Sequence, residues 1–272
     1  RLRIEAPVPG ESYVGIEVPN TEHTLVRLRP LLESPEFASA KSSLAIPLGR
    51  GVSGQPIVSD LAGMPHLLIA GTTNSGKSVC IAALTMSLVM NNNPDDLKLV
   101  MIDPKRVELN RFNGLPHLLG EVETNIDRIM AVLRWATTEM DNRYRLLEVV
   151  HARNLDSYNQ KMDKLGKPRM PRVVLLIDEL ADLMMTNPGE VEESICRLAQ
   201  LARAAGIHLI IATQRPSVNV ITGVIKANIP SRLSFAVVSQ VDSRTILDMG
   251  GAEKLLGNGD MLFHPMGLSK PV

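Results

Sequence analysis

The segment Gly71–Ser78, GTTNSGKS, constrains the fold of this chain more than any other stretch. It matches the phosphate-binding loop pattern G-x-x-x-x-G-K-[ST] at every fixed position. The apolar residues His66–Ala70 before it predict a short buried strand, and the apolar residues after it predict a helix. Glycines let backbone N–H groups turn towards phosphates, and the amino end of a helix adds partial positive charge. The segment therefore predicts a nucleoside triphosphate site between a strand and a helix.

Two side chains of this loop have separate predicted roles. Lys77 is expected to reach the β- and γ-phosphates, and the hydroxyl of Ser78 is expected to ligate Mg²⁺. The predicted nucleotide-binding set is the whole loop: Gly71, Thr72, Thr73, Asn74, Ser75, Gly76, Lys77 and Ser78.

The remainder of the chain after residue 60 alternates between strand and helix patterns. Apolar runs occur at 66–70, 98–102, 173–177, 208–212 and 233–238. One helix is predicted to begin near Thr124, with Asp127 in a capping position, and another to run from about Glu190 to Ala205, where Gly206 ends it. This alternation predicts an α/β domain over 61–272 with a largely parallel sheet.

Residues 1–60 have a different character, with many Pro and Gly residues and short alternating runs. Tyr13–Val18 and Leu25–Arg29 alternate as half-buried strands do, and two further strands are predicted around the glycine-rich turn Gly49–Gly54. We predict a small β-rich module here, although this composition also fits a linker. Residues 161–172 are basic and hold two prolines, which favours an exposed connection over a DNA contact.

A pair of carboxylates follows the apolar run Val173–Ile177. After a phosphate-binding loop, such a pair is expected to complete the nucleotide site, with Asp178 holding Mg²⁺ and Glu179 polarising the attacking water as general base. The alternative is a strand that ends in an acidic turn or a helix N-cap. The combination with Gly71–Ser78 favours a hydrolytic site.

Two further side chains are candidates to contact the γ-phosphate of a bound nucleotide. Gln214 follows the predicted strand 208–212, where it could contact this phosphate or orient water, the alternative being a cap on the next loop. Arg203 precedes the same strand. Composition alone favours a surface salt bridge for Arg203 over an arginine finger that reaches a neighbouring subunit's nucleotide.

The charge of the chain is balanced, with 29 basic and 29 acidic residues, so any nucleic-acid surface must be local. The stretch 194–241 has no acidic residue but holds Arg197, Arg203, Arg215, Lys226 and Arg232, a strip that favours contact with a phosphate backbone. The two cysteines form no disulfide pattern, which indicates a reducing cytoplasm. No apolar run approaches about 18 residues. Because the chain begins with Arg and ends with Val, we expect it to be a piece of a longer protein.

Several motifs together resemble those of the FtsK/SpoIIIE DNA translocases. They are Gly71–Ser78, Met101–Lys105, Ile177–Glu179, Ala202–His208, Ala212–Ser217 and Asp242–Asp248. The resemblance implies a RecA-like P-loop ATPase domain that uses ATP and Mg²⁺ and works as a homo-hexameric ring with double-stranded DNA in its pore. It also implies that residues 1–60 are part of a smaller domain, and that the process served is chromosome segregation at cell division.

The resemblance changes the expectation for several residues. Arg203 becomes the arginine finger that acts in trans, and Arg215, Lys226 and Arg244 fall on segments similar to DNA-binding pore loops. Gln240 departs from the family pattern, in which Lys is expected, so a basic contact from this position is in doubt. The family implies a cytoplasmic motor of an inner-membrane protein, anchored through a segment absent here. The alternative is a related ring ATPase of protein secretion or conjugative DNA transfer.

Overall fold

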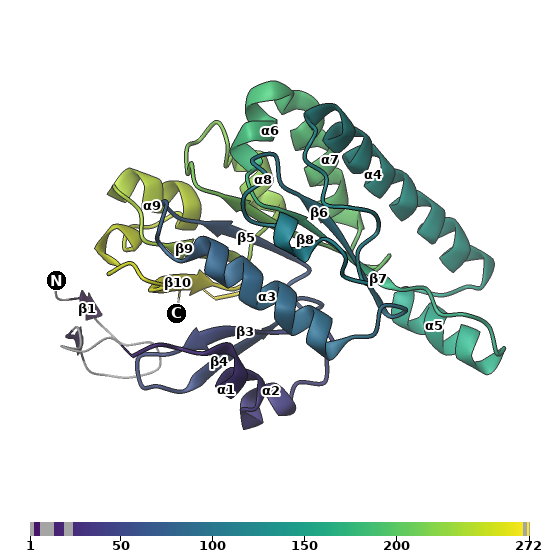
Figure 1. Ribbon diagram of the computed structural model, residues 1–272, viewed down its shortest axis with the longest axis horizontal. Coiled ribbons are helices and arrows are strands. Elements are labelled where there is room, and N and C mark those ends of the chain that lie inside the picture. The colour runs from purple at the N-terminus through teal and green to yellow at the C-terminus, as the bar shows by residue number, and fades with distance from the viewer. Residues whose placement is uncertain (1–2, 6–13, 19–23, 269–270, 272) are drawn as a thin grey trace.

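A six-stranded sheet lies at the centre of the computed structural model, which describes residues 3–5, 14–18, 24–268 and 271 (Figure 1). Its strand order is β10-β9-β5-β8-β7-β6. The strands are β5 (His66–Ala70), β6 (Leu97–Ile102), β7 (Arg172–Ile177), β8 (Ile207–Thr213), β9 (Arg232–Phe235) and β10 (Met261–His264). Only β10 runs antiparallel to its neighbour. This confirms the predicted α/β fold with a mainly parallel sheet.

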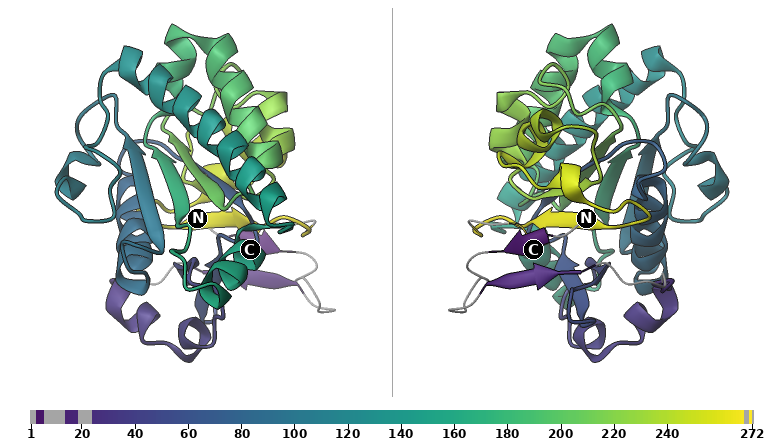
Figure 2. Two further views of the ribbon diagram at one scale, coloured as in Figure 1. Left: turned by 90° about the vertical axis from the view of Figure 1, so that its right-hand side faces the viewer. Right: turned by 90° about the vertical axis from the view of Figure 1, so that its left-hand side faces the viewer.

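Helices cover both faces of the sheet (Figure 2). Successive residues of a strand point to opposite faces, so Leu67 and Ile69 of β5 pack towards α3 (Lys77–Asn91), whereas Leu68 packs in the core on the other face. That other core contains α4 (Ile126–Val149), α6 (Leu180–Thr186) and α7 (Pro188–Leu201). The continuous apolar strands of the sequence follow from this burial on both sides.

The hairpin β3 (Ala45–Arg50) and β4 (Pro56–Asp60) lies below α3 in the view of Figure 1. Its residues Leu44 and Ile46 belong to the same core cluster as Leu84 and Leu88 of α3. The strands predicted around Gly49–Gly54 are therefore confirmed. Two short helices, α1 (Leu28–Leu32) and α2 (Pro35–Ala38), precede the hairpin, and β1 (Arg3–Glu5) pairs with β2 (Gly15–Glu17).

The prediction of a strand over Leu25–Arg29 is wrong, because α1 begins at Leu28. Pro30 falls in the first turn of this helix, where a missing N–H costs nothing, and Leu31 is the residue that the helix buries. Of the predicted strand Tyr13–Val18, Tyr13 lies outside the described residues and β2 covers the middle.

Three helix boundaries differ from the predictions. The N-cap of α4 is Asn125 rather than Thr124, since the Asn125 side chain accepts hydrogen bonds from the amides of Asp127 and Arg128. Helix α7 ends at Leu201, not Ala205, because the turn 202–206 already redirects the chain into β8. Residues 161–164 belong to α5 (Leu155–Lys164), so only the later part of 161–172 is a connection.

The remaining elements lie in the connections between strands. They are η1 (Asn110–Phe112), α8 (Gly223–Asn228), α9 (Gln240–Leu247) and η2 (Ala252–Lys254). The apolar run 233–238 is only partly strand, because β9 ends at Phe235. Among the described residues, no helix combines the length and apolar character that crossing a bilayer requires.

Leu133 of α4 provides a test of how much stability the packing on this face contributes. Its side chain is fully buried, whereas Leu146 on the same helix is 46 % exposed. We expect Leu133→Ala to lower the free energy of unfolding by about 2–5 kcal/mol. Leu146→Ala should change it by less than about 0.5 kcal/mol. Urea denaturation measures both values when the m value of each variant equals that of the wild type. Equal losses of unfolding free energy in the two variants would contradict this description of the core.

Candidate active site

The loop between β5 and α3 has the tight backbone that phosphate binding requires. A Cβ atom at Gly71 would lie 2.6 Å from Cβ of Phe235 and 2.7 Å from Oγ of Ser75. Gly76 has φ +116°, and a Cβ there would lie 2.7 Å from Cα of Gly259. A side chain at either position would therefore clash with neighbouring atoms, and at Gly76 it would also be strained by the left-handed backbone.

Several backbone amides of this loop are free to bind an anion. Within the described part of the chain, no acceptor is bonded to the amides of Thr73, Asn74, Gly76, Lys77 and Ser78. The N-cap of α3 is Gly76, which supplies no side-chain cap. Because such amides and the helix dipole both favour negative charge, the loop has the properties of a phosphate site.

Lys77 is joined to the end of β7 by a buried ion pair. Its Nζ atom donates to Oδ1 of Asp178 at 2.8 Å and to the carbonyl oxygen of Asp178 at 2.9 Å. The other carboxylate oxygen, Oδ2, is buried and has no hydrogen-bond partner among the described residues. Burial raises the pKa of Asp178 despite the opposing charge of Lys77, and the nearby carboxylates of Asp103 and Glu108 add to the rise.

Ser78 is held by a carboxylate that the sequence patterns did not single out. Its Oγ atom donates to Oε1 of Glu108 at 2.7 Å. Glu108 is fixed in turn by Asp103, whose Oδ2 atom accepts from the amides of Glu108 and Leu109 at 3.0 and 2.9 Å. Asp103 directly follows β6, so it lies at the carboxyl edge of the sheet, where open α/β sheets bind their ligands.

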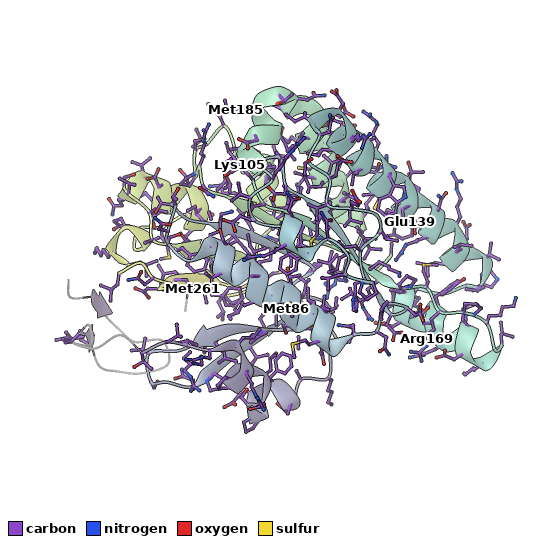
Figure 3. The ribbon with its side chains drawn as sticks, viewed as in Figure 1. Met86, Lys105, Glu139, Arg169, Met185 and Met261 are labelled. Atoms are coloured by element: carbon purple, nitrogen blue, oxygen red, sulfur yellow. The ribbon has the colours of Figure 1, made fainter. Side chains whose placement is uncertain are left out.

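The Glu179 carboxylate is surrounded by donors. Oε1 accepts from Oγ1 of Thr213 at 2.6 Å, and Oε2 accepts from Nζ of Lys105, which is labelled in Figure 3, at 3.0 Å. The amide of Gln214 lies 3.2 Å from both oxygens. Burial alone would raise the pKa of Glu179, but the hydrogen bonds from Thr213 and Lys105 outweigh it and lower this pKa.

Glu179 is also the N-cap of α6, because Oε1 accepts from the amide of Ala181 at 3.4 Å. The N-cap alternative therefore describes part of its role. This hydrogen bond is the longest of those that the carboxylate accepts. Capping of α6 does not explain why Lys105 and Thr213 also donate to Glu179. No sequence pattern identifies these two residues as partners of Glu179.

Gln214 lies against the phosphate-binding loop. Its Oε1 atom accepts from Oγ1 of Thr73 at 3.0 Å. This contact follows from the strand order, in which β8 is hydrogen-bonded to β5 on one side and to β7 on the other.

Arg203 does not belong to this constellation within one chain. It lies in the turn before β8, whereas Gln214 follows β8, so the seven residues of the strand place them about 20 Å apart along its axis. The Arg203 side chain is exposed and forms no hydrogen bond or ion pair with any described residue. Arg197, by contrast, pairs with Asp141 at 2.8 Å.

The three candidate DNA-binding residues differ in their availability. The Arg215 side chain is exposed, and its one polar contact among the described residues is with Sδ of Met185, at 3.3 Å. Arg244 on α9 is exposed and has no side-chain partner among the described residues. Lys226 on α8 is already paired with Asp248 at 2.6 Å, and Arg232 shares the same carboxylate.

Comparison with known proteins places these residues in a family. Residues 27–218 match the model of the FtsK/SpoIIIE family. The DNA translocase FtsK of Clostridium tetani is 60 % identical over 272 residues, which is 100 % of this chain and 37 % of the relative. The DNA translocase SpoIIIE of Bacillus subtilis is 54 % identical over 277 residues, covering 100 % of this chain and 35 % of the relative. The chain thus spans little more than a third of these relatives' length.

Solved structures agree with the fold. The pCW3 conjugation coupling protein TcpA, determined with ATPγS, has a TM-score of 0.77 at 26 % identity over 99 % of this chain and 75 % of its own. The type VII secretion ATPase EccC of Thermomonospora curvata has a TM-score of 0.73 at 23 % identity over 84 % of this chain and 28 % of its own, which shows a shared fold. The family-model match and the identities over the whole chain together establish that this chain belongs to the FtsK/SpoIIIE family.

Proposed function

We propose that this chain is the ATP-driven motor region of a double-stranded DNA translocase. The observation that carries the proposal is the convergence of Lys77, Asp178, Glu179 and Gln214 on one phosphate-binding loop. The relatives named DNA translocase favour DNA as the cargo over protein.

The loop amides and Lys77 bind the phosphates of ATP in this proposal. Lys77 has to exchange its contact with Asp178 for the β- and γ-phosphates, so the buried pair holds the ammonium group in place until nucleotide arrives. The TcpA structure with ATPγS supports a nucleotide in this fold.

The residues around Asp178 fit a Mg²⁺ site. The buried Oδ2 atom of Asp178 lacks a partner among the described residues, and the hydroxyl of Ser78 follows the loop lysine. Hydroxyl and carboxylate oxygens suit this hard cation, which when bound would offset the charge of the phosphates. Ser78 can ligate the cation through an oxygen lone pair while its hydrogen stays bonded to Glu108.

Glu179 and Gln214 are assigned to the attacking water, with Glu179 as general base and Gln214 as the group that orients the water or senses the γ-phosphate. Arg203 supplies the remaining positive charge from a neighbouring subunit. Its exposure and its place at the opposite edge of the sheet support a contact in trans. We propose a homo-hexameric ring, part of an inner-membrane protein whose motor works in the cytoplasm.

We assign the DNA contacts to Arg215, Arg244 and Lys226. We propose that the motor serves chromosome partition at cell division. Arg215 and Arg244 are exposed, whereas Lys226 has to leave Asp248 before it can reach a phosphate. The likeness to the conjugation coupling protein TcpA keeps conjugative DNA transfer as the second candidate. A secretion motor is the third, and DNA stimulation of hydrolysis separates it from the first two.

The direct test of the proposed cargo is phosphate release by the purified chain with and without duplex DNA. The oligomeric size of the chain is measured in the same preparation. We expect duplex DNA to stimulate hydrolysis and this stimulation to fall in Arg215→Ala and Arg244→Ala, because each removes a contact to the phosphate backbone. The stimulation should also weaken as salt rises. Hydrolysis indifferent to duplex DNA would contradict a DNA motor.

Glu179→Ala should leave ATP binding intact and slow hydrolysis by about 10²–10⁴-fold, the usual contribution of a general base. Lys77→Ala is the matched comparison, because it should weaken nucleotide binding itself. Binding of a fluorescent ATP analogue and phosphate release distinguish the two variants. Turnover near the wild-type rate in Glu179→Ala would remove Glu179 from the mechanism.

The assignment of Arg203 predicts complementation between inactive variants. Arg203→Ala alone should lose about 10³–10⁵-fold in rate, as for other arginine fingers. When it is mixed with Glu179→Ala, some interfaces combine an intact Arg203 with an intact Glu179, so activity should return. Arg197→Ala, which removes an exposed pair with Asp141, is the control and should retain activity. A mixture as inactive as its parts would rule out a shared site.

A further inference from the structure

We infer that Thr213 and Lys105 hold Glu179 in a withdrawn position, and that the segment after β8, which carries Arg215, controls its release. This inference rests on the proposed function, since it assigns to Glu179 the role of general base. It adds two positioning residues and a physical link from the candidate DNA contact to hydrolysis.

Glu179 cannot act as a base where it now lies. Oε1 is bonded to Thr213 at 2.6 Å and Oε2 to Lys105 at 3.0 Å, and the side chain is 0 % exposed. A general base must come within hydrogen-bond reach of the water that it activates. The carboxylate therefore has to leave at least one of these donors before hydrolysis.

The Thr213 hydroxyl lies between Glu179 and the segment that carries Arg215. It has one hydrogen to donate and two acceptors near it, Oε1 of Glu179 at 2.6 Å and the carbonyl oxygen of Arg215 at 3.4 Å. The same hydroxyl accepts from the amide of Arg215 at 3.1 Å. A shift of this segment that brings its carbonyl closer would take the hydrogen from Glu179.

Lys105 also has a second acceptor within reach. Its Nζ atom lies 3.9 Å from Oδ2 of Asp182, which belongs to the first turn of α6. If Glu179 moves, Lys105 can pair with Asp182, so no ammonium group is left without a partner. Both donors thus have two possible acceptors, which is what a two-state element requires.

The link to DNA comes from Arg215 itself. Its side chain is exposed, and its backbone N–H and C=O are the groups that contact Thr213. A phosphate backbone that draws Arg215 outward would bias the Thr213 hydroxyl towards one acceptor. Such a ligand can shift the equilibrium only by its differential affinity for the two positions of the segment.

The test compares Thr213→Val, which removes the hydroxyl, with Thr213→Ser, which keeps it. Phosphate release is measured without DNA and with saturating duplex DNA. We expect Thr213→Val to raise the DNA-free rate by about tenfold and to lower the stimulation factor, because one hydrogen bond to a charged group is lost. Thr213→Ser should retain the wild-type factor. A fall of both rates in Thr213→Val with an unchanged factor would overturn the inference.

Lys105→Gln is the second variant, and it decides the question if Thr213→Val fails to fold in a thermal melt. It should raise the DNA-free rate in the same way, whereas a decrease would overturn the inference. If wild-type hydrolysis does not respond to duplex DNA, the proposed DNA motor fails separately. The DNA-free rates then decide alone: a rise in Thr213→Val but not in Thr213→Ser supports the withdrawn position of Glu179, and no rise overturns it.

Discussion

The buried ion pair between Lys77 and Asp178 is the interaction on which the rest of the site depends. Two charges out of water are tolerated only when each is paired and hydrogen-bonded, and Lys77 meets this condition through both the carboxylate and the carbonyl oxygen of Asp178. The pair joins the phosphate-binding loop after β5 to the end of β7. It thereby fixes where the adjoining residues Ser78 and Glu179 lie.

The strand order explains why the pair spans the middle of the sheet. Because β8 lies between β5 and β7, the residues that follow it face both the loop and the carboxylates. Gln214 shows this directly: its side chain accepts from Thr73 in the loop, while its amide donates to Glu179. Three strand ends thus form one surface, on which phosphate groups, a cation and water can be brought together.

The sequence was sufficient to predict the parts of the site that have a fixed local pattern. The loop, the carboxylate pair after an apolar run and the polar end of the next strand each follow from residue types at short spacing. Lys105 and Thr213 fall in motifs shared with the family, but their contacts with Glu179, and that of Glu108 with Ser78, could not be predicted. These contacts depend on the path of the segment after β6 and on a single hydroxyl at a strand end. The helix α1 was missed because five alternating residues fit a strand equally well. The role of Arg203 as an arginine finger could be predicted only from the family resemblance, because within one chain this residue lies at the far edge of the sheet.

In the proposed mechanism, Lys77 exchanges its contact with Asp178 for a phosphate group when nucleotide binds. A structure of this chain with a non-hydrolysable ATP analogue and Mg²⁺ tests it most directly. We expect Nζ of Lys77 to contact a phosphate oxygen and its bond to Oδ1 of Asp178 to be lost. An analogue bound at Gly71–Ser78 with the Lys77–Asp178 pair intact, or an analogue bound elsewhere, would contradict it.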